Sequence, residues 1–456
     1  MTKKSKFTSK LGFVMAAAGS AVGLGNLWRF PYLAARHGGG TFLFIYVILA
    51  VTFGFTLMVT EIAIGRKTER SVLTAYGALN PSFKFLGPLG ALIPMIITPY
   101  YCVIGGWITK YMCTYVSGHG LEAVSDDYFT QFITGWKEPL IFLIIYVGVN
   151  AVIVSAGVQK GIEKFSKILM PILIVLSVII AVVGLTSKGS MSGLIYYLKP
   201  ALHGDTAAMK ATNLVQAIIA AAGQLFYSLS IAMGILITYG AYMDHKEPIE
   251  KSVRNIEVID TLIAFIAGLI VVPSVFVFAG GAKAASTSGP SLMFVMLPKV
   301  FNTMHFGSLI GAAFFALVFL AALTSSMSLM ETIVAVVEEV TPLRRPVSSL
   351  VSAAGIFLVG IPSMLGYGVW GDVKIFGMQF LDFFDFISNT IMMPILAFLT
   401  CVLIGYVTGP KIIKEEIERS ETTFKSEKMY NVMVRFVAPV FLLAILGTSI
   451  IGLFQG

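Results

Sequence analysis

Polar side chains interrupt the first long apolar segment of this 456-residue sequence near its centre. Asn26 and Arg29 follow three closely spaced glycines, Gly19, Gly23 and Gly25. Glycine weakens the interior of a helix, and an amide or guanidinium inside an apolar segment is costly unless it faces protein, water or a ligand. Glycines alone would fit a face for close helix packing equally well. The two polar side chains favour an interrupted helix that lines a cavity.

A second polar cluster lies half-way through the sixth apolar segment, where residues 223–234 run Gly-Gln-Leu-Phe-Tyr-Ser-Leu-Ser-Ile-Ala-Met-Gly. Interrupted helices at matching positions of two five-helix halves are typical of inverted-repeat carriers, in which ligands bind near mid-depth where the two breaks meet. The two segments together therefore predict a binding site made of free backbone groups, hydroxyls and an amide.

The composition of the chain places these segments in lipid. Of its residues 57% are hydrophobic and only 12% are charged, and apolar stretches of about 20 residues, long enough to cross a bilayer as helices, recur along nearly the whole length. The first stretch lacks a small-residue cleavage pattern, so we interpret it as a retained span. We predict eleven spans, at residues 11–35, 41–65, 87–117, 139–157, 166–186, 212–241, 256–281, 305–338, 346–367, 376–407 and 430–453.

The chain is thus predicted to be an all-α polytopic membrane protein. Lys and Arg are enriched in alternate loops, which places the N-terminus inside the cell and, with an odd number of spans, the C-terminus outside. The predicted divisions are a cytoplasmic N-terminal segment (1–10), a first five-helix repeat (11–186), an extracellular connection (187–211), a second repeat (212–407) that includes an external re-entrant segment (288–303), a solvated cytoplasmic loop (408–429) and an eleventh helix (430–456).

Several functional classes are disfavoured by the residues present. The net charge of +8 is spread over short loops, so nucleic acid is not an expected partner. Cys102, Cys113 and Cys401 lie in apolar stretches without metal-ligand spacing and are interpreted as packing residues. The five histidines form neither a metal motif nor a nucleophile and base pattern, so we expect no catalytic residues and no enzyme. A channel is disfavoured because channel filters are usually rings built from several subunits.

Seven motifs occur along the apolar segments. They are Gly19-Ser-Ala-Val-Gly-Leu-Gly-Asn26-Leu-Trp-Arg-Phe-Pro-Tyr32, Gly38-Gly-Gly40, Glu61-Ile-Ala-Ile-Gly-Arg66, Tyr100-Tyr101, Gln224-Leu-Phe-Tyr-Ser-Leu-Ser230, Leu323-Thr-Ser-Ser326 and Leu381-Asp-Phe-Phe-Asp-Phe386. This series resembles the neurotransmitter:sodium symporter family over essentially the whole chain, and the eleven-span length is similar to its bacterial members. The resemblance implies a LeuT-type 5+5 inverted repeat with broken helices 1 and 6, plus an eleventh helix. It also implies sodium-coupled amino-acid import across a bacterial cytoplasmic membrane by a monomer or weak homodimer.

The resemblance implies two sodium sites. Sodium is a hard cation that prefers oxygen ligands, and interrupted helices supply them as free carbonyls. The first site would use Ala21, Asn26, Ser228 and Asp260 together with the substrate carboxylate. The second would use Gly19, Val22, Ala321, Thr324 and Ser325. Hydroxyls at 324–326 would alternatively bond only their own helix backbone.

Asp260 departs from the family pattern, which usually places Asn at the aligned position. Tyr46, Gln224 and Ser228 match residues of the chloride pocket found in many animal members. A fixed carboxylate would supply the negative charge that chloride supplies there, so we expect no chloride requirement. Two alternatives are that Asp260 titrates and carries a proton outward, or that it caps a helix.

The resemblance also implies the substrate class. Monoamine carriers of the family have an aspartate where this chain has Gly23, and glycine leaves room for a substrate carboxylate beside Ala21, the amides of Leu24 and Gly25, and the Tyr101 hydroxyl. The ammonium would meet carbonyls near Ser20, Tyr227 and Ser228 and the hydroxyl of Ser325. The pocket for the substrate side chain would be mostly apolar, which favours hydrophobic or aromatic L-amino acids; it would be lined by Ile97, Tyr227, Ser230, Met233, Ser326 and Leu329. Met233 stands where relatives commonly have an aromatic residue. Its flexible side chain either lets the pocket admit larger substrates or only packs against its neighbours.

Charged residues at both ends of the site match the gates of the family. Arg29 and Asp385 match the outer ion pair, above Tyr101 and Tyr227. At the inner side Glu339 and Tyr242 match, whereas Lys4, Phe7 and Ala241 replace the usual Arg, Trp and Ser. Lysine cannot form the bidentate pair of arginine, so a looser inner gate is expected. Glu61 matches an acid that braces the unwound sixth helix; the alternative is an interfacial charge beside Arg66.

Two other functions stay open at this point. The same architecture would suit a sodium-coupled carrier of another small amine or an osmolyte. It would also suit an amino-acid sensor that binds its ligand without moving it.

Overall fold

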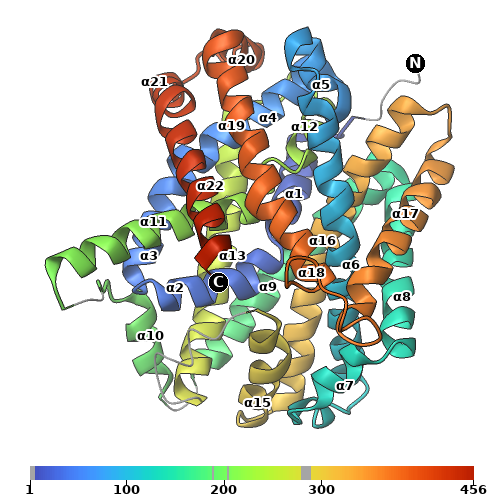
Figure 1. Cartoon of the computed structure of the whole chain (residues 1–456), viewed down its shortest axis with the longest axis vertical. Helices are drawn as coiled ribbons and strands as arrows, with labels where there is room; N and C mark the ends of the chain where they lie inside the picture. The colour runs from blue at the N-terminus through green and yellow to red at the C-terminus, as the bar shows by residue number, and fades with distance from the viewer. Residues whose placement is uncertain (1–5, 187–188, 203–204, 279–288, 456) are drawn as a thin grey trace.

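The computed structural model describes residues 6–186, 189–202, 205–278 and 289–455, which form helices joined by turns (Figure 1). Lys4 and parts of two predicted segments, at 187–188, 203–204 and 279–288, lie outside the described residues. The helices are α1 (Lys10–Ala21), α2 (Phe30–Arg36), α3 (Gly40–Leu49), α4 (Phe55–Thr68), α5 (Val72–Leu79), α6 (Leu86–Val116), α7 (Tyr128–Thr134), α8 (Lys137–Ser155), α9 (Lys164–Leu185), α10 (Ser190–Leu198), α11 (Ala207–Ser228), α12 (Ile235–Ala241), α13 (Ile249–Phe278), α15 (Leu297–Asn302), α16 (Gly307–Val340), α17 (Arg345–Leu365), α18 (Phe380–Asp385), α19 (Met393–Val402), α20 (Lys411–Ile417), α21 (Glu427–Val432) and α22 (Ala438–Gln455).

Nine helices of the described part are long and apolar enough to cross a bilayer: Gly40–Thr68, Pro81–Val116, Lys137–Ser155, Val158–Leu185, Ile249–Phe278, Gly307–Val340, Arg345–Leu365, Phe380–Val407 and Glu427–Thr448. A further span consists of α1 and the segment Gly25–Arg36, which are bent by 51° relative to each other. The sixth predicted span, 212–241, is divided into α11 and α12 by residues 229–234. Both predicted interruptions are therefore present.

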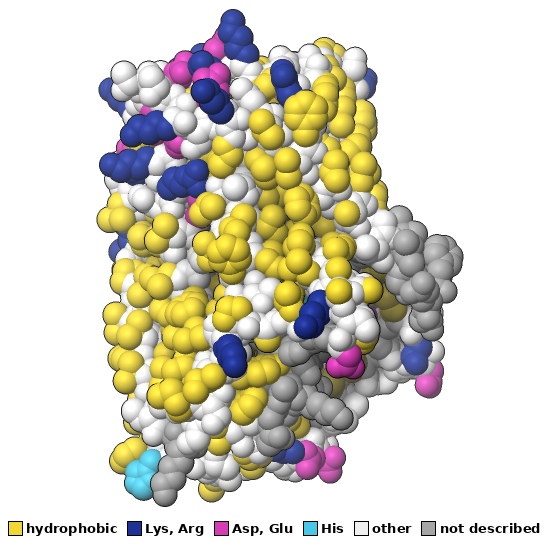
Figure 2. All heavy atoms as spheres, turned by 90° about the vertical axis from the view of Figure 1, so that its left-hand side faces the viewer, with side chains coloured by type: hydrophobic (Ala, Val, Ile, Leu, Met, Phe, Trp, Pro, Cys, Tyr) yellow, Lys and Arg dark blue, Asp and Glu magenta, His cyan; other side chains and the backbone are white. Residues whose placement is uncertain are grey.

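Different short helices lie at the two ends of the molecule, and the two ends also differ in charge. Figure 1 shows α5, α20 and α21 at the end near the N-terminus, and α7, α10 and α15 at the opposite end. On the face seen in Figure 2, hydrophobic side chains cover a broad middle band, and Lys, Arg, Asp and Glu gather mainly at the end that carries α20 and α21. This distribution is typical of a protein with a lipid-facing belt and a charged aqueous end.

The second half of α1 lies in the interior because its residues are small and mostly apolar on every side. Ala16, Ala17, Ala18 and Gly19 are all buried, and α1 packs against α9, α13 and α16. A helix that is apolar all round has no face for water. The position of α1 brings its interrupted end to the middle of the bundle, beside α16.

The predicted re-entrant segment at 288–303 contains a short apolar helical stretch, Leu292–Asn302, which includes α15. It packs against α13 and α16 at the end opposite α20. The stretch is too short to span a bilayer.

The prediction that residues 408–429 form a solvated loop is wrong in one respect. Ile413, Ile417 and Phe424 of this segment are buried, and so is the carboxylate of Glu416. The segment folds into α20, which packs against α4. The charged residues that suggested a solvated linker therefore include an acid that belongs to the protein interior.

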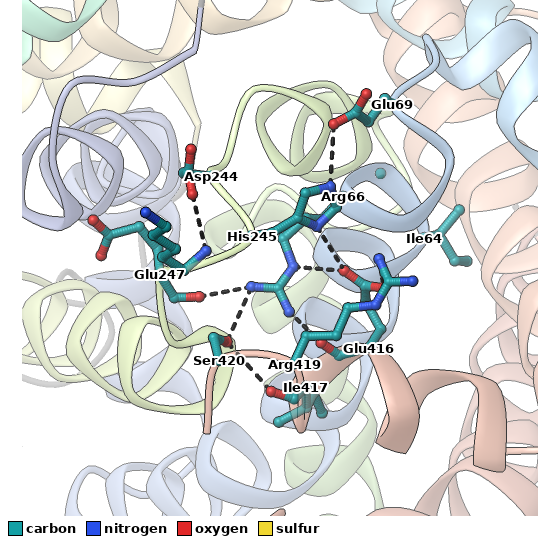
Figure 3. A network of polar contacts seen from close by, with 12 residues as sticks. Ile64, Arg66, Glu69, Asp244, His245, Glu247, Glu416, Ile417, Arg419 and Ser420 are labelled. Atoms are coloured by element: carbon teal, nitrogen blue, oxygen red, sulfur yellow. Dashed lines mark hydrogen bonds and ion pairs between the residues drawn. The ribbon is translucent and has the colours of Figure 1, made fainter. Parts of the chain in front are cut away.

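Glu416 is buried because it meets the equally buried guanidinium of Arg66, at the end of α4 (Figure 3). Arg66 Nε donates to Glu416 Oε1 at 2.8 Å, one terminal nitrogen donates to the Glu416 carbonyl, and the other donates to the carbonyl of Glu247 at 2.6 Å. His245 Nδ1 lies 3.4 Å from Glu416 Oε1, and its Nε2 lies 3.2 Å from Glu69 Oε1. This network joins α4, the α12–α13 loop and α20.

Candidate functional site

The break in the first span exposes the last carbonyls of α1 to other elements. After α1, the backbone of Val22 is extended (φ −74°, ψ 97°). A π-helical turn, Gly25–Arg29, then leads into α2. Carbonyls in the last turn of a helix lack partners within that helix. The carbonyl oxygens of Gly19, Ser20 and Val22 lie 3.4, 3.0 and 3.3 Å from one hydroxyl, Ser325 Oγ of α16.

Gly23 and Gly25 allow this break to approach its neighbours closely. A Cβ atom at position 23 would lie 2.6 Å from Ser325 Oγ and 3.0 Å from the Tyr101 hydroxyl oxygen. A Cβ atom at position 25 would lie 2.4 Å from Cδ1 of Tyr227. Any larger side chain at position 23 would therefore occupy the space between the break and α6.

The second break has a strained backbone that a buried acid holds in place. Ser230 and Ala232 have φ values of 54° and 60°, which cost free energy for residues other than glycine. Glu61 Oε1 accepts a hydrogen bond from the N–H of Ala232 at 2.7 Å. Ser230 Oγ donates to the carbonyl of Ser20 at 3.1 Å, which ties the two breaks together. The contact expected for Glu61 is thus present, and Glu61 is buried rather than interfacial.

A narrow cavity of about 20 Å³, room for roughly one water molecule, lies between the two breaks, α6 and α16. Its lining combines polar groups of the first break and of α16 with apolar side chains. The lining residues are Ser20, Ala21, Gly23, Leu24, Gly25, Ile97, Tyr101, Tyr227, Ser230, Met233, Ile235, Ser325 and Leu329. The cavity is too small for a ligand of amino-acid size, so binding requires its walls to move apart.

Two predicted substrate residues do not reach this cavity. Ser228, which was predicted to offer the substrate its carbonyl, does not line the cavity, and its hydroxyl donates to Asp260 at 2.9 Å. The Ser326 hydroxyl donates to Asn150 Oδ1 at 2.8 Å and lies 2.9 Å from the Tyr146 hydroxyl, so it faces α8. Conversely, Ile235 lines the cavity without having been predicted, because only the geometry of the second break decides which residue of α12 points inward.

We therefore expect Ser326→Ala to leave ligand selectivity unchanged and to reduce stability. The substitution removes a hydroxyl that bonds the buried Asn150 and Tyr146, and an unsatisfied buried group costs about 1–3 kcal/mol. Thermal denaturation in detergent and competition binding with a panel of amino acids would measure the two effects separately. A change in the preferred amino acid without loss of stability would indicate that Ser326 contacts the substrate.

A buried carboxylate, that of Asp260 on α13, lies next to the first break. It accepts hydrogen bonds from Asn26 Nδ2 at 2.7 Å, from Ser228 Oγ at 2.9 and 3.1 Å, and from the Tyr46 hydroxyl at 3.3 Å. Asn26 Oδ1 in turn accepts the N–H of Gly23 at 3.1 Å. Within the described residues no Lys, Arg or His forms an ion pair with Asp260.

A buried charge needs a partner of opposite sign, and the oxygens around Asp260 suit a small hard cation. Three predicted ligands of the first sodium ion lie together, since Asn26 and Ser228 both donate to Asp260. Of the residues matched to the chloride pocket, Tyr46 and Ser228 bond the Asp260 carboxylate directly. Gln224 instead donates to the carbonyl of Gly25 at 2.9 Å. Asp260 does not cap a helix, because it lies inside α13, eleven residues after the first residue of that helix.

A second oxygen cluster lies where α16 passes the end of α1. It contains the carbonyls of Gly19 and Val22, both within 3.4 Å of Ser325 Oγ. The Thr324 hydroxyl donates to its own helix, to the carbonyls of Leu320 and Ala321 at 3.1 Å each, as the alternative interpretation expects, whereas the Ser325 hydroxyl reaches the end of α1. The five predicted ligands of the second sodium ion thus come from two adjacent segments of α1 and α16, and all offer neutral oxygen atoms.

The outer pair is not closed in this structure. Arg29 and Asp385, both described, form no ion pair; they line a cavity of about 210 Å³ together with Tyr227 and Asn389. Asp385 Oδ1 accepts hydrogen bonds from the Tyr100 hydroxyl at 3.0 Å and from Asn389 Nδ2 at 2.6 Å. The guanidinium of Arg29 lies 5.6 Å from the ring centre of Tyr227. The two predicted gate residues therefore face one cavity but remain apart.

The inner side is closed by the first described residues of the chain. Phe7 packs edge-on against Phe13 and Tyr239, with ring centres 5.6 and 5.5 Å apart, and its N–H donates to the Tyr242 carbonyl at 3.0 Å. The ammonium of Lys6 lies 3.1 Å from Glu69, and this hydrogen bond lowers the pKa of Glu69. Phe7, which stands where the family usually has tryptophan, thus still packs against the aromatic residues of the inner side.

Glu339 and Tyr242, both matched to the inner gate, contact different residues. Glu339 accepts hydrogen bonds from the Ser71 N–H at 2.7 Å and from the Thr74 hydroxyl, both at the start of α5. The Tyr242 hydroxyl donates instead to Glu331 Oε1 at 2.8 Å, and Glu331 is ion-paired with Arg345. Glu331 was missed, although an acid inside an apolar span is itself a signal of function.

The chain is similar to known proteins over nearly its whole length. A family model described as the sodium:neurotransmitter symporter family matches residues 4–121 and 131–455. A protein of Bacillus subtilis (strain 168), named an uncharacterized sodium-dependent transporter YhdH, is 34% identical over 449 residues, which cover 97% of each chain. An uncharacterized sodium-dependent transporter of Haemophilus influenzae is 31% identical over 459 residues, again covering 97% of each chain.

A similar solved structure is described as MhsT in complex with L-phenylalanine. It is 33% identical in sequence and matches with a TM-score of 0.87, covering 98% of this chain and 100% of that chain. The likeness therefore extends over the whole bundle and includes both interrupted spans.

Proposed function

Because this chain belongs to the sodium:neurotransmitter symporter family, we propose that it imports hydrophobic and aromatic L-amino acids with two sodium ions and without chloride. It is a sodium-coupled membrane transporter and not an enzyme. The proposed location is the cytoplasmic membrane of a bacterium, with the N-terminus inside, the C-terminus outside, and a monomer or weak homodimer as the unit.

The proposal depends on one observation. Two interrupted helices meet beside a buried carboxylate, a second cluster of oxygens and a cavity with an apolar wall. Free carbonyls and hydroxyls can replace the water around sodium, and the apolar wall can receive a hydrocarbon side chain. A site of this kind links occupation by the ion to occupation by the substrate.

The substrate carboxylate is proposed to lie at the first break. Gly23 leaves space there, the Leu24 N–H already points at the Tyr101 hydroxyl with a separation of 3.4 Å, and the Asp260 cluster lies on the other side of the break. A carboxylate in this position would approach both the helix N-terminus and the first sodium ion. The ammonium would replace Ser325 and Ser230 as a donor to the Ser20 carbonyl.

The wall that meets the substrate side chain is proposed to set selectivity. Ile97, Met233, Ile235 and Leu329 are apolar and come from α6, the second break, α12 and α16. The flexible side chain of Met233 can move to admit larger rings. MhsT is described as a complex with L-phenylalanine, which supports an aromatic substrate for a similar site.

Alternating access is proposed to use the contacts seen at the two sides. On the inner side, opening would separate Phe7 from Tyr239 and Tyr242. On the outer side, closing would bring Arg29 toward Asp385 across the cavity they now line. The proposed inner gate includes Lys4, Glu339 and Tyr242, with Glu331 and Arg345 added by the structure.

A thermal-shift screen of the purified protein against the twenty amino acids, in sodium and in choline, tests the proposal. A ligand bound only to the native state raises stability by RT ln(1 + [L]/Kd), about 2.7 kcal/mol at a hundred times Kd. We expect Phe, Tyr, Trp, Leu and Ile to raise the melting temperature in sodium and to have little effect in choline.

Three outcomes would contradict parts of this proposal. Stabilisation by betaines or amines, but not by amino acids, would indicate a carrier of another class. Equal shifts of the melting temperature in choline and in sodium would show that binding is not coupled to sodium. Binding without counterflow of labelled amino acid in vesicles would indicate a sensor.

A further inference from the structure

A groove of about 360 Å³ lies on the outside of the bundle between α1 and α13. Its apolar walls come from Leu11 and Met15 on one side and from Val258 and Ile259 on the other. Leu11 and Val258 are 59% and 65% exposed. Since both helices are membrane spans, an exposed apolar groove between them faces lipid.

The groove has a polar end. Lys10, at the start of α1, and Asn255, in the first two turns of α13, line it together with the apolar residues. Asn255 is six residues from the start of α13, or about 9 Å along the helix. The polar end therefore lies near the surface that carries the N-terminus, and the apolar part runs toward the middle of the membrane.

The charged groups near the Lys10 ammonium are Lys251, Glu247 and Glu421. The carboxylate of Glu421 accepts hydrogen bonds from the N–H groups of Glu250 and Lys251, at 3.0 and 3.3 Å, at the start of α13. Within the described residues neither Lys10, which is half-buried, nor the exposed Lys251 forms an ion pair. Both ammonium groups can therefore meet a negative group at the membrane surface.

We propose that this groove binds one anionic phospholipid of the cytoplasmic leaflet. Its phosphate would meet Lys10 and Lys251, Asn255 would donate to a headgroup or ester oxygen, and one acyl chain would lie along Leu11, Met15 and Val258. Lysine side chains reach such headgroups readily because their hydrocarbon stems pack on apolar surface while the ammonium stays at the interface.

The bound lipid would act on the ion sites through α1. This helix carries the carbonyls of Gly19 and Val22, which belong to the second oxygen cluster. A lipid that contacts both α1 and α13 would stabilise their present packing. It would therefore slow any movement of α1 that opens the inner side.

Tryptophan quenching in lipid nanodiscs tests lipid binding independently of transport. Val258→Trp places an indole on the lipid-exposed wall of the groove, and lipids with brominated acyl chains quench it on contact. We expect a relative association constant roughly fivefold higher for brominated phosphatidylglycerol than for brominated phosphatidylcholine, for each lysine that contributes. Adding Lys10→Gln or Lys251→Gln should lower this preference.

Two matched variants serve as controls. Leu358→Trp, on the lipid-exposed side of α17, should be quenched equally by both lipids. Lys428→Gln, which removes an exposed lysine of α21, should leave the preference at position 258 unchanged. Equal quenching of Val258→Trp by both lipids, or a preference that survives both lysine substitutions, would overturn the proposal. Neither result would affect the proposed transport of amino acids.

Discussion

Asp260→Asn is expected to reduce sodium-dependent amino-acid uptake about a hundredfold in chloride-free medium, and chloride should restore part of it. The substitution removes the buried carboxylate that bonds Asn26, Ser228 and Tyr46. Loss of one partner of a buried charge pair costs about 3 kcal/mol or more, which corresponds to a factor of roughly one hundred. The hydroxyls of Tyr46 and Ser228 remain as donors for a chloride ion in place of the carboxylate. Uptake of labelled substrate into vesicles, in chloride and in gluconate, measures this effect.

The wild-type protein provides the reference for this experiment. It should transport equally well in chloride and in gluconate, because the negative charge is part of the chain. A wild type that loses uptake without chloride as completely as the variant does would reject the role of Asp260 as a fixed anion. Outward proton movement coupled to uptake, and abolished by Asp260→Asn, would show instead that this carboxyl carries a proton.

Glu416→Gln should lower the free energy of unfolding by about 3–5 kcal/mol, the cost of leaving one member of a buried ion pair without its partner. Arg66 and Glu416 are both completely buried and 2.8 Å apart. The amide can still accept one hydrogen bond, but it no longer balances the charge of the guanidinium. Thermal denaturation of the purified protein, followed by loss of monodisperse material, measures the change.

Two further variants distinguish the ion pair from a general effect of mutation in α20. Arg66→Met combined with Glu416→Leu should recover much of the stability, because a buried ion pair can often be replaced by apolar residues of similar volume. Lys411→Gln, in an exposed pair with Glu415 at 3.7 Å, should change the melting temperature little. A melting temperature of Glu416→Gln equal to that of Lys411→Gln would contradict the importance of the buried pair.

The sequence alone determined the family, the LeuT-type fold and the places where two spans are interrupted. The family and the fold followed from the resemblance of the motif series, whereas the interruptions depend on local composition. Glycines beside Asn26 and Arg29, and the polar residues at 223–234, are unfavourable in a continuous apolar helix wherever that helix lies. Most of the substrate residues that the resemblance implied line one cavity in the structure.

Only the tertiary structure decided which side chains meet across different helices. Glu331 and Glu339 are eight residues, or about 12 Å, apart along α16, and no local pattern records that the Tyr242 hydroxyl meets Glu331. The rotation of α16 similarly turns Ser326 toward Asn150 and away from the cavity. The charged segment 408–429 appeared solvated because its partner, Arg66, lies 350 residues earlier in the chain. The partners of a buried polar group are chosen by the relative depth and rotation of separate helices, which no local pattern records.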